Sequence, residues 1–178
     1  MKCNAITIAN EFIATAKKEC VPITHLRLMK LVYIAYGFGL SVLGSGKMID
    51  DRFDTVEAWK FGPVIPSVYH TFKHFKDKPI TEFGEIATSV TDEEKADYKT
   101  PRLSNERDDC TRKTIINFVW RRYKNMSASD LVHLLHLNGA PWALSYRVGE
   151  NAIIPEKITK RYYDLLLDDI YDNARRKD

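Results

Sequence analysis

The first two helices predicted along the chain differ in how much of their surface is apolar. Residues 5 to 17 carry apolar side chains on one narrow stripe, which is typical of a helix that packs by a single face. Residues 26 to 43 are apolar nearly all round, which predicts burial on most sides. We therefore expect the second helix to be the central one, capped at its start by the hydroxyl of Thr24.

Two glycines lie inside this central helix. Gly37 and Gly39 each cost about 1 kcal/mol relative to alanine in a helix interior. We expect this cost to be offset by close packing of a neighbouring element against the helix.

A stretch in the middle of the chain, residues 56 to 69, has a different pattern. From Val56 to Phe61 the side chains alternate in direction at period two, which predicts a strand. Gly62-Pro63 is expected to end this strand, because glycine tolerates unusual backbone angles and proline lacks an N–H donor. Pro66 suits the first turn of a helix, and apolar residues follow it at helical spacing. The stretch is predicted to form a strand, a rigid corner and a helix.

The aromatic side chains of this stretch allow two interpretations. Trp59 and Phe61, together with two prolines, could form a stiff binding surface of large area that has little entropy left to lose. The alternative is that both aromatic side chains fill the core.

The second half of the chain returns to helices after a polar interval. Residues 77 to 105 are irregular, and we expect loops and partner-specific function there. Within this interval, residues 86 to 90 are a candidate strand that would pair with the strand at Val56. Helices are predicted from about 104 or 108 to 123, from a capping box at 127–130 to Asn138-Gly139, briefly at Pro141-Trp142, and after Pro155.

The predicted fold class is mainly α. We expect a single compact domain over residues 1–178, with about six helices and a small β element, a short strand or hairpin near residues 54–62. Residues 173–178 form a charged tail that we expect to be frayed.

Composition supports a single cytoplasmic domain. A chain of 178 residues can bury a sizeable core, and its formal charge of +3 is too small to imply nucleic acid binding. The three cysteines are an odd number without paired spacing, which favours a reduced compartment. No signal-peptide pattern is present, and the apolar run from Leu31 to Leu43 is shorter than the roughly 20 residues of a membrane span. We therefore expect no membrane partner.

Most patterns that carry chemistry are missing from the sequence. His70 and His74, and likewise His133 and His136, have spacings that can hold a metal, but no third ligand is recognisable. No phosphate loop, dinucleotide fingerprint or nucleophile elbow is present. We expect no catalytic residue, no metal and no cofactor, and we expect that the protein is not an enzyme.

Basic residues form two small clusters that leave one alternative open. They are Arg121, Arg122 and Lys124 in one cluster, and Lys157, Lys160 and Arg161 in the other. Such short clusters are typical of solvated helix faces. The alternative is a DNA-binding regulator that uses these basic helices with the small β element.

A histidine near the C-terminal end of a predicted helix precedes the Pro141-Trp142 turn. His136 at that end can carry its charge favourably against the helix dipole, and its ring could hydrogen-bond the backbone of the turn. The functional interpretation is that Trp142 joins Trp59 and Phe61 in an exposed aromatic anchor for a partner.

Three strings of the sequence resemble the Panacea domain of the SocA-like antitoxin family. The most specific is Glu57-Ala-Trp-Lys-Phe-Gly-Pro-Val64. The others are Leu26-Arg-Leu-Met-Lys-Leu-Val-Tyr-Ile-Ala-Tyr-Gly37, and Leu131-Val-His-Leu-Leu-His136 followed by Gly139-Ala-Pro-Trp142. Leu135 stands where the family typically has threonine, so no role of a Thr-His pair is carried over.

The resemblance implies an antitoxin that binds and neutralises a cognate toxin protein. It also implies a variant in which the antitoxin is an adaptor that delivers its toxin to a protease. We expect the scaffold of the partner site to be Trp59, Phe61, Gly62, Pro63, Val64, Pro66, Tyr69, His136, Pro141 and Trp142. Contacts specific to one partner are expected from residues 77–105.

Overall fold

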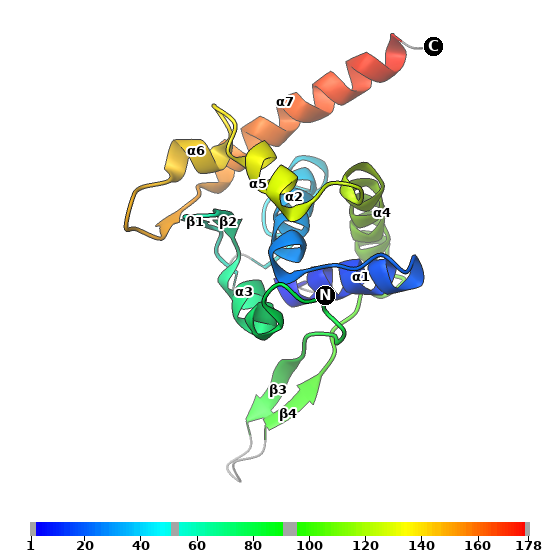
Figure 1. Cartoon of the computed structure of the whole chain (residues 1–178). Helices are drawn as coiled ribbons and strands as arrows, with labels where there is room; N and C mark the ends of the chain where they lie inside the picture. The colour runs from blue at the N-terminus through cyan, green and yellow to red at the C-terminus, as the bar shows by residue number, and fades with distance from the viewer. Residues whose placement is uncertain (1–2, 51–53, 91–95, 177–178) are drawn as a thin grey trace.

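The computed structural model describes residues 3–50, 54–90 and 96–176. The elements follow one another as α1 (Ala5–Lys18), α2 (His25–Leu43), β1 (Glu57–Trp59), β2 (Gly62–Val64), α3 (Pro66–Phe72), a 3₁₀ turn η1 (Lys73–Phe75), β3 (Ile86–Val90), β4 (Ala96–Lys99), α4 (Arg107–Tyr123), α5 (Ala128–Leu135), α6 (Pro141–Ser145), β5 (Ala152–Ile153) and α7 (Glu156–Arg175). Figure 1 shows helices grouped around α2, with the strands at the periphery. The predicted mainly α class with a small β element is confirmed, with seven α-helices in the described ranges where about six were expected.

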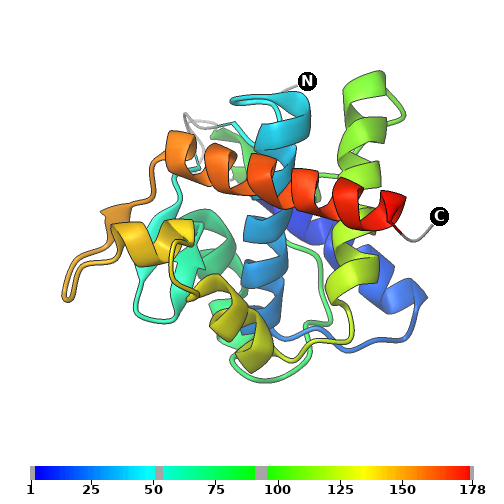
Figure 2. The same ribbon diagram turned by 90° about the horizontal axis from the view of Figure 1, so that it is seen from above.

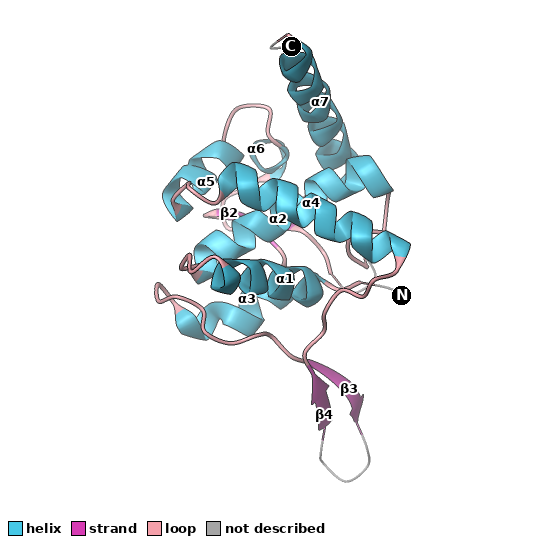
Figure 3. Cartoon of the chain, turned by 90° about the vertical axis from the view of Figure 1, so that its right-hand side faces the viewer, coloured by secondary structure: helices cyan, strands magenta, loops and turns pink. Residues whose placement is uncertain are grey.

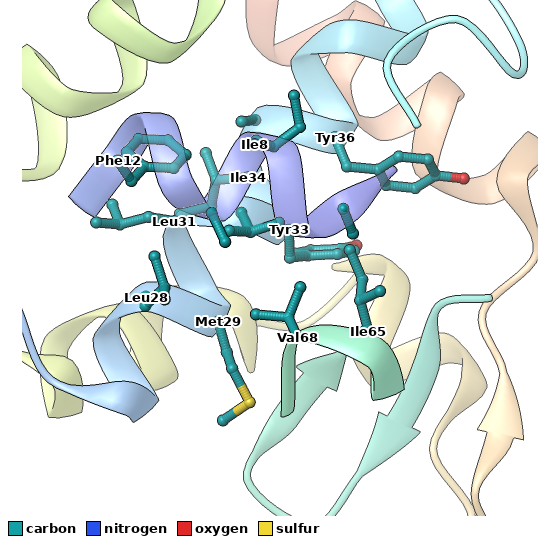
Figure 4. Close-up of a cluster of buried hydrophobic side chains, with 14 of the residues drawn as sticks. Ile8, Phe12, Leu28, Met29, Leu31, Tyr33, Ile34, Tyr36, Ile65 and Val68 are labelled. Atoms are coloured by element: carbon teal, nitrogen blue, oxygen red, sulfur yellow. The ribbon is translucent and has the colours of Figure 1, made fainter. Parts of the chain in front are cut away.

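Helix α2 is the centre of the fold, as its all-round apolar pattern predicted. It contacts α1, α3, α4, α5 and α7, and its residues from Leu28 to Leu40 are all buried. Figure 4 shows its side chains meeting those of α1 and α3 in one cluster. The expected cap is only partly confirmed: Thr24 is the N-cap residue, but its side chain makes no capping hydrogen bond.

The glycines of α2 lie under other elements, as expected. A Cβ at Gly37 would come 2.2 Å from a ring carbon of Tyr163, because α7 crosses directly over α2 (Figure 2). A Cβ at Gly39 would come 2.4 Å from Met48. The missing side chains therefore allow α7 and the 44–50 segment to approach the helix axis.

By length and composition, α2 could also cross a membrane. It is 19 residues long, more than the apolar run from Leu31 to Leu43 suggested, and 72% of its most apolar window is buried inside the fold. The core helix of a globular domain has the same properties, and here the apolar surface is covered by other helices.

The predicted corner is instead a β-hairpin with a two-residue turn, residues 60 and 61. Antiparallel pairing joins Ala58 to Pro63 and Trp59 to Gly62, so Gly62-Pro63 continues the sheet where we expected it to end. Pro63 is tolerated because β2 is an edge strand of the sheet β2-β1-β5, where a missing N–H breaks no ladder bond. Helix α3 then begins at Pro66, as predicted.

The predicted pairing of residues 86–90 with the Val56 strand is wrong. Strand β3 pairs with β4, which follows it in the chain, and β1 pairs on its other side with β5. The β3–β4 hairpin stands off from the helical body (Figure 3). Residues 91–95 of the 77–105 interval lie outside the described residues.

The helices of the C-terminal half begin close to their predicted starts, but α5 ends earlier than predicted. Ser127 and Asp130 form the predicted capping box of α5, with both hydrogen bonds present. The helix ends at Leu135, earlier than the predicted Asn138-Gly139. Residues 173–175 of the tail expected to be frayed are the last turn of α7.

Candidate functional site

The turn of the β1–β2 hairpin presents an aromatic side chain to solvent. Phe61 is 63% exposed, whereas Trp59 is half-buried and packs against the core. Of the two interpretations of these aromatic side chains, exposed surface therefore applies to Phe61. Trp59 instead joins that surface to the core. Lys60 lies beside the Phe61 ring, with its ammonium 5.5 Å from the ring centre.

Two hydrogen bonds fix the position of Trp59. Its indole N–H donates to the Glu57 carboxylate at 2.7 Å. Its carbonyl oxygen accepts from the indole N–H of Trp142 at 2.8 Å, which ties α6 to the hairpin. The bond to Glu57 holds the ring, and the bond from Trp142 holds the backbone of the same residue. Trp59 therefore has little rotational freedom left to lose on binding.

Tyr69 of α3 continues the same surface. Its ring meets that of Trp59 edge-on, at a centroid distance of 4.8 Å, and lies 5.2 Å from that of His25. Burial lowers the pKa of His25, and its Nε2 has no hydrogen-bond partner among the described residues. Tyr69 therefore bridges the start of α2 and the hairpin.

His136 caps the C-terminal end of α5 and packs against Trp142. The two ring centroids are 3.6 Å apart, and Trp142 also stacks on Tyr146 at 4.7 Å. The predicted link between His136 and the Pro141-Trp142 turn exists, but it is made by the rings. The His136 Nδ1 instead lies 2.5 Å from the carbonyl oxygen of Val132, in its own helix.

We call Trp59, Phe61, Tyr69, His136 and Trp142 the aromatic corner. Apart from Phe61, its members form a connected set of ring contacts and hydrogen bonds that joins β1, α3, α5 and α6. Four other predicted residues lie in β2, α3 and α6. Pro63, Val64 and Pro141 are buried, and Pro66 is half-buried at the start of α3.

A buried lysine, absent from the predicted site, holds the hairpin in place. Lys30 of α2 is fully buried, and its ammonium donates to the carbonyl oxygen of Pro63 at 3.0 Å. In an antiparallel pair, every second residue of a strand turns its carbonyl away from its neighbour, and an edge strand has none on that side. Lys30 therefore satisfies an edge carbonyl that the sheet cannot.

Burial has a large effect on this lysine. It lowers the pKa of Lys30 to about 7, because the charged amine has lost its water. The side chain is thus near the point where both protonation states are populated at neutral pH. Either state can donate a hydrogen bond to Pro63.

Gly62 lies where Lys30, His136 and the hairpin meet. Its φ of +101° favours glycine. A Cβ at this position would come 2.9 Å from the Lys30 ammonium and 3.2 Å from Cε1 of His136. The hairpin therefore fits against these two side chains only because residue 62 has none.

The sequence contains an indication that Lys30 is buried, which the prediction of the site did not use. It is the only charged side chain between Leu28 and Leu43 in a helix that is otherwise apolar on most faces. A charge in that setting must be buried with a polar partner. The identity of the partner could not be read from the sequence, because it is a backbone atom 33 residues away.

Asn10 of α1 holds the base of the β3–β4 hairpin. Its side-chain amide donates to the carbonyl oxygens of Gly84 at 2.9 Å and Pro101 at 3.1 Å, and its oxygen accepts from the Gly84 N–H at 2.8 Å. Because Gly84 precedes β3 and Pro101 follows β4, one buried side chain joins both ends of the projection. Tyr98 on β4 is 64% exposed.

The candidate metal ligands and the three cysteines all lie within the described residues. Within them, no three His, Cys, Asp or Glu side chains come close enough to hold a metal ion. The three cysteines are free, and burial raises the pKa of Cys3 to about 12.

The basic clusters are partly neutralised. Lys124 pairs with Glu19, and Lys160 pairs with Asp164, each at 2.8 Å. Affinity for duplex DNA that falls steeply with salt is the measurement that would favour the DNA-binding alternative.

The fold and site together define a small helical domain that displays a rigid aromatic surface. The sequence model of the family described as "Antitoxin SocA-like, Panacea domain" matches residues 28–143. The chain belongs to this family. The matched segment contains Lys30 and the whole aromatic corner, whereas α7 lies outside it.

One curated relative shows the same relationship. The chain is 32% identical to Antitoxin SocA of Caulobacter vibrioides (strain NA1000 / CB15N) over 139 residues, which are 78% of this chain and 68% of that protein. No solved structure matches the chain.

Proposed function

We propose that this protein is the antitoxin of a toxin–antitoxin pair and neutralises a cognate toxin protein by binding it directly. Family membership supports the antitoxin role. The observation that carries direct binding is the exposed Phe61 on a hairpin fixed by Lys30 and Trp142. Exposed aromatics on a preorganised frame are typical centres of protein interfaces.

The aromatic corner contributes the shared part of the proposed interface. Its rings are held by contacts within the domain, so binding would order few additional side chains. Apolar burial around Phe61 would contribute affinity, and occlusion of the toxin's working surface would inhibit it.

The β3–β4 hairpin contributes the contacts specific to one toxin. It projects from the helical body (Figure 3), carries the exposed Tyr98, and is held at its base by Asn10. Substitutions in such a projection change a binding surface with little effect on the core.

The experiment is co-expression with the product of the neighbouring reading frame. The proposal predicts that this product is toxic alone, that this protein rescues growth, and that the two purify as a stable complex. Absence of both rescue and binding would contradict it.

We further propose, from family behaviour alone, an adaptor role in which the bound toxin is delivered to a protease. Toxin levels should then fall during rescue rather than stay constant. Deletion of residues 173–178 should raise toxin levels if this end recruits the protease. Unchanged levels and protection after the deletion would exclude that recruitment.

A further inference from the structure

Two open, mainly apolar cavities of about 370 and 310 Å³ lie beside α7, and the side chain of Tyr162 lines both. We call this surface the α7 groove. It is lined by residues of α2, α4, α5, α6 and α7 and by Met126 and Gly139, and its exposed or charged members include Arg122, Leu144, Lys157, Arg161 and Leu165.

Two leucine side chains of the groove are exposed to solvent. Leu165 is 59% exposed and Leu144 is 52% exposed. Met126, Leu134 and Leu166 are half-buried beside them and pack against the core. Large apolar side chains gathered in one concave surface indicate an interaction site.

The charged residues of the groove all have the same sign. Arg122, Lys157 and Arg161 are exposed, and none of them forms an ion pair with another described residue. No acidic side chain is among the lining residues. A partner that fills the groove must therefore bring its own acidic groups if these charges are to be paired.

The dimensions suit a short helix. The groove follows α7 from Ile158 to Leu166, a distance of about 12 Å at 1.5 Å per residue. An amphipathic helix of two or three turns, with apolar side chains at i, i+3 or i+4, and i+7, matches this length. Tyr162 at the middle would contact its central apolar residue.

We propose that the α7 groove binds an amphipathic helix of a partner protein that carries acidic side chains beside its apolar face. The groove is separate from the aromatic corner in its lining residues, and its α7 side lies outside the segment that the family model matches. This binding does not require that the toxin is the partner.

The test uses the full-length protein and two fluorescein-labelled helical peptides of about 15 residues, or four turns. Both carry leucine at the same i, i+3, i+4 and i+7 positions, and their flanking positions are glutamate in one and lysine in the other. Fluorescence anisotropy should show the glutamate peptide binding at least about tenfold more tightly than the lysine peptide. The double variant Lys157→Glu/Arg161→Glu should reverse this preference.

A matched pair of variants on α7 supplies the control. Leu165→Glu, within the groove, should abolish binding of the glutamate peptide. Tyr171→Glu, at a side chain that is 66% exposed on the same helix but outside the groove, should leave it unchanged. Both should unfold at the wild-type temperature, because both positions are exposed.

Three results would overturn the proposal: neither peptide binds, both bind equally, or the two α7 variants behave alike. Sedimentation of the protein without peptide tests whether a second copy of the chain occupies the groove instead. A dimer that Leu165→Glu dissociates would assign the groove to a second copy of the chain.

Discussion

The ammonium of Lys30 lies 3.0 Å from the carbonyl oxygen of Pro63, and this contact joins the centre of the helical core to the edge of the hairpin that carries Phe61. Such a contact costs desolvation of a charge, which is offset only in part by one hydrogen bond to a neutral acceptor. Fixing the hairpin in this way therefore lowers the stability of the fold. The cost can be measured from the free energy of unfolding.

The first prediction concerns the pH dependence of stability. The pKa of Lys30 is about 7 when folded and about 10.4 in an unfolded chain. Between these values the unfolded state binds the proton more tightly, so the free energy of unfolding should rise with pH, by about 1 kcal/mol per unit. Urea unfolding between pH 7 and 8.5 measures this slope.

Lys30→Met supplies the control for that slope. It keeps the length of the side chain and removes the titrating group, so its unfolding free energy should vary much less with pH. The window stops at 8.5 because burial also raises the pKa of Cys3 and Tyr33 above their ordinary values of 9 and 10, with the opposite effect on stability. Equal slopes in the two proteins would show that Lys30 is not the cause.

The second prediction concerns the close approach at Gly62. Gly62→Ala forces an alanine to φ +101° and places its Cβ against Lys30 and His136. Gly149→Ala imposes a similar strain at φ +81° with no atom within 4 Å. Each should lose about 1–3 kcal/mol from backbone strain, and Gly62→Ala should lose a further 1 kcal/mol or so from overpacking. Equal losses in urea unfolding would contradict the described packing.

The third prediction concerns the base of the β3–β4 hairpin. Asn10→Ala removes three hydrogen bonds and leaves buried groups of Gly84 and Pro101 without partners. Each unsatisfied group costs about 1–3 kcal/mol, so the variant should lose at least about 3 kcal/mol of stability. Tyr98→Ala, on the exposed strand, should change stability by less than about 0.5 kcal/mol. An Asn10→Ala variant of wild-type stability would show that the β3–β4 hairpin does not depend on the hydrogen bonds of Asn10.

Periodicity predicted the helical core well but the sheets poorly. The apolar pattern of residues 26–43 identifies α2 because every residue from Leu28 to Leu40 is buried. The capping box at Ser127 is equally local, and it was confirmed. Strand pairing is not local: β1 pairs with β5, almost a hundred residues later, through short strands that carry little pattern of their own.

The sequence proposed residues for the candidate site, but it did not show how they are arranged. Family resemblance selected Trp59 and Trp142, but only the structure shows that the indole N–H of one donates to the carbonyl of the other. Lys30 was not among the predicted site residues, because its partner is a backbone oxygen and a sequence does not show which backbone atoms a side chain contacts. Gly62-Pro63 was expected to end a strand because an edge position, where proline is tolerated, cannot be recognised before the sheet is known.

The most direct test of the account is the affinity for the toxin of a variant at the hairpin turn. Isothermal titration with the purified toxin should give a dissociation constant about tenfold or more weaker for Phe61→Ala than for the wild type, with an unchanged unfolding midpoint. Tyr171→Ala, which removes a similarly exposed aromatic from α7, should bind as the wild type does. If Phe61→Ala binds the toxin with full affinity, the aromatic corner is not the toxin-binding surface.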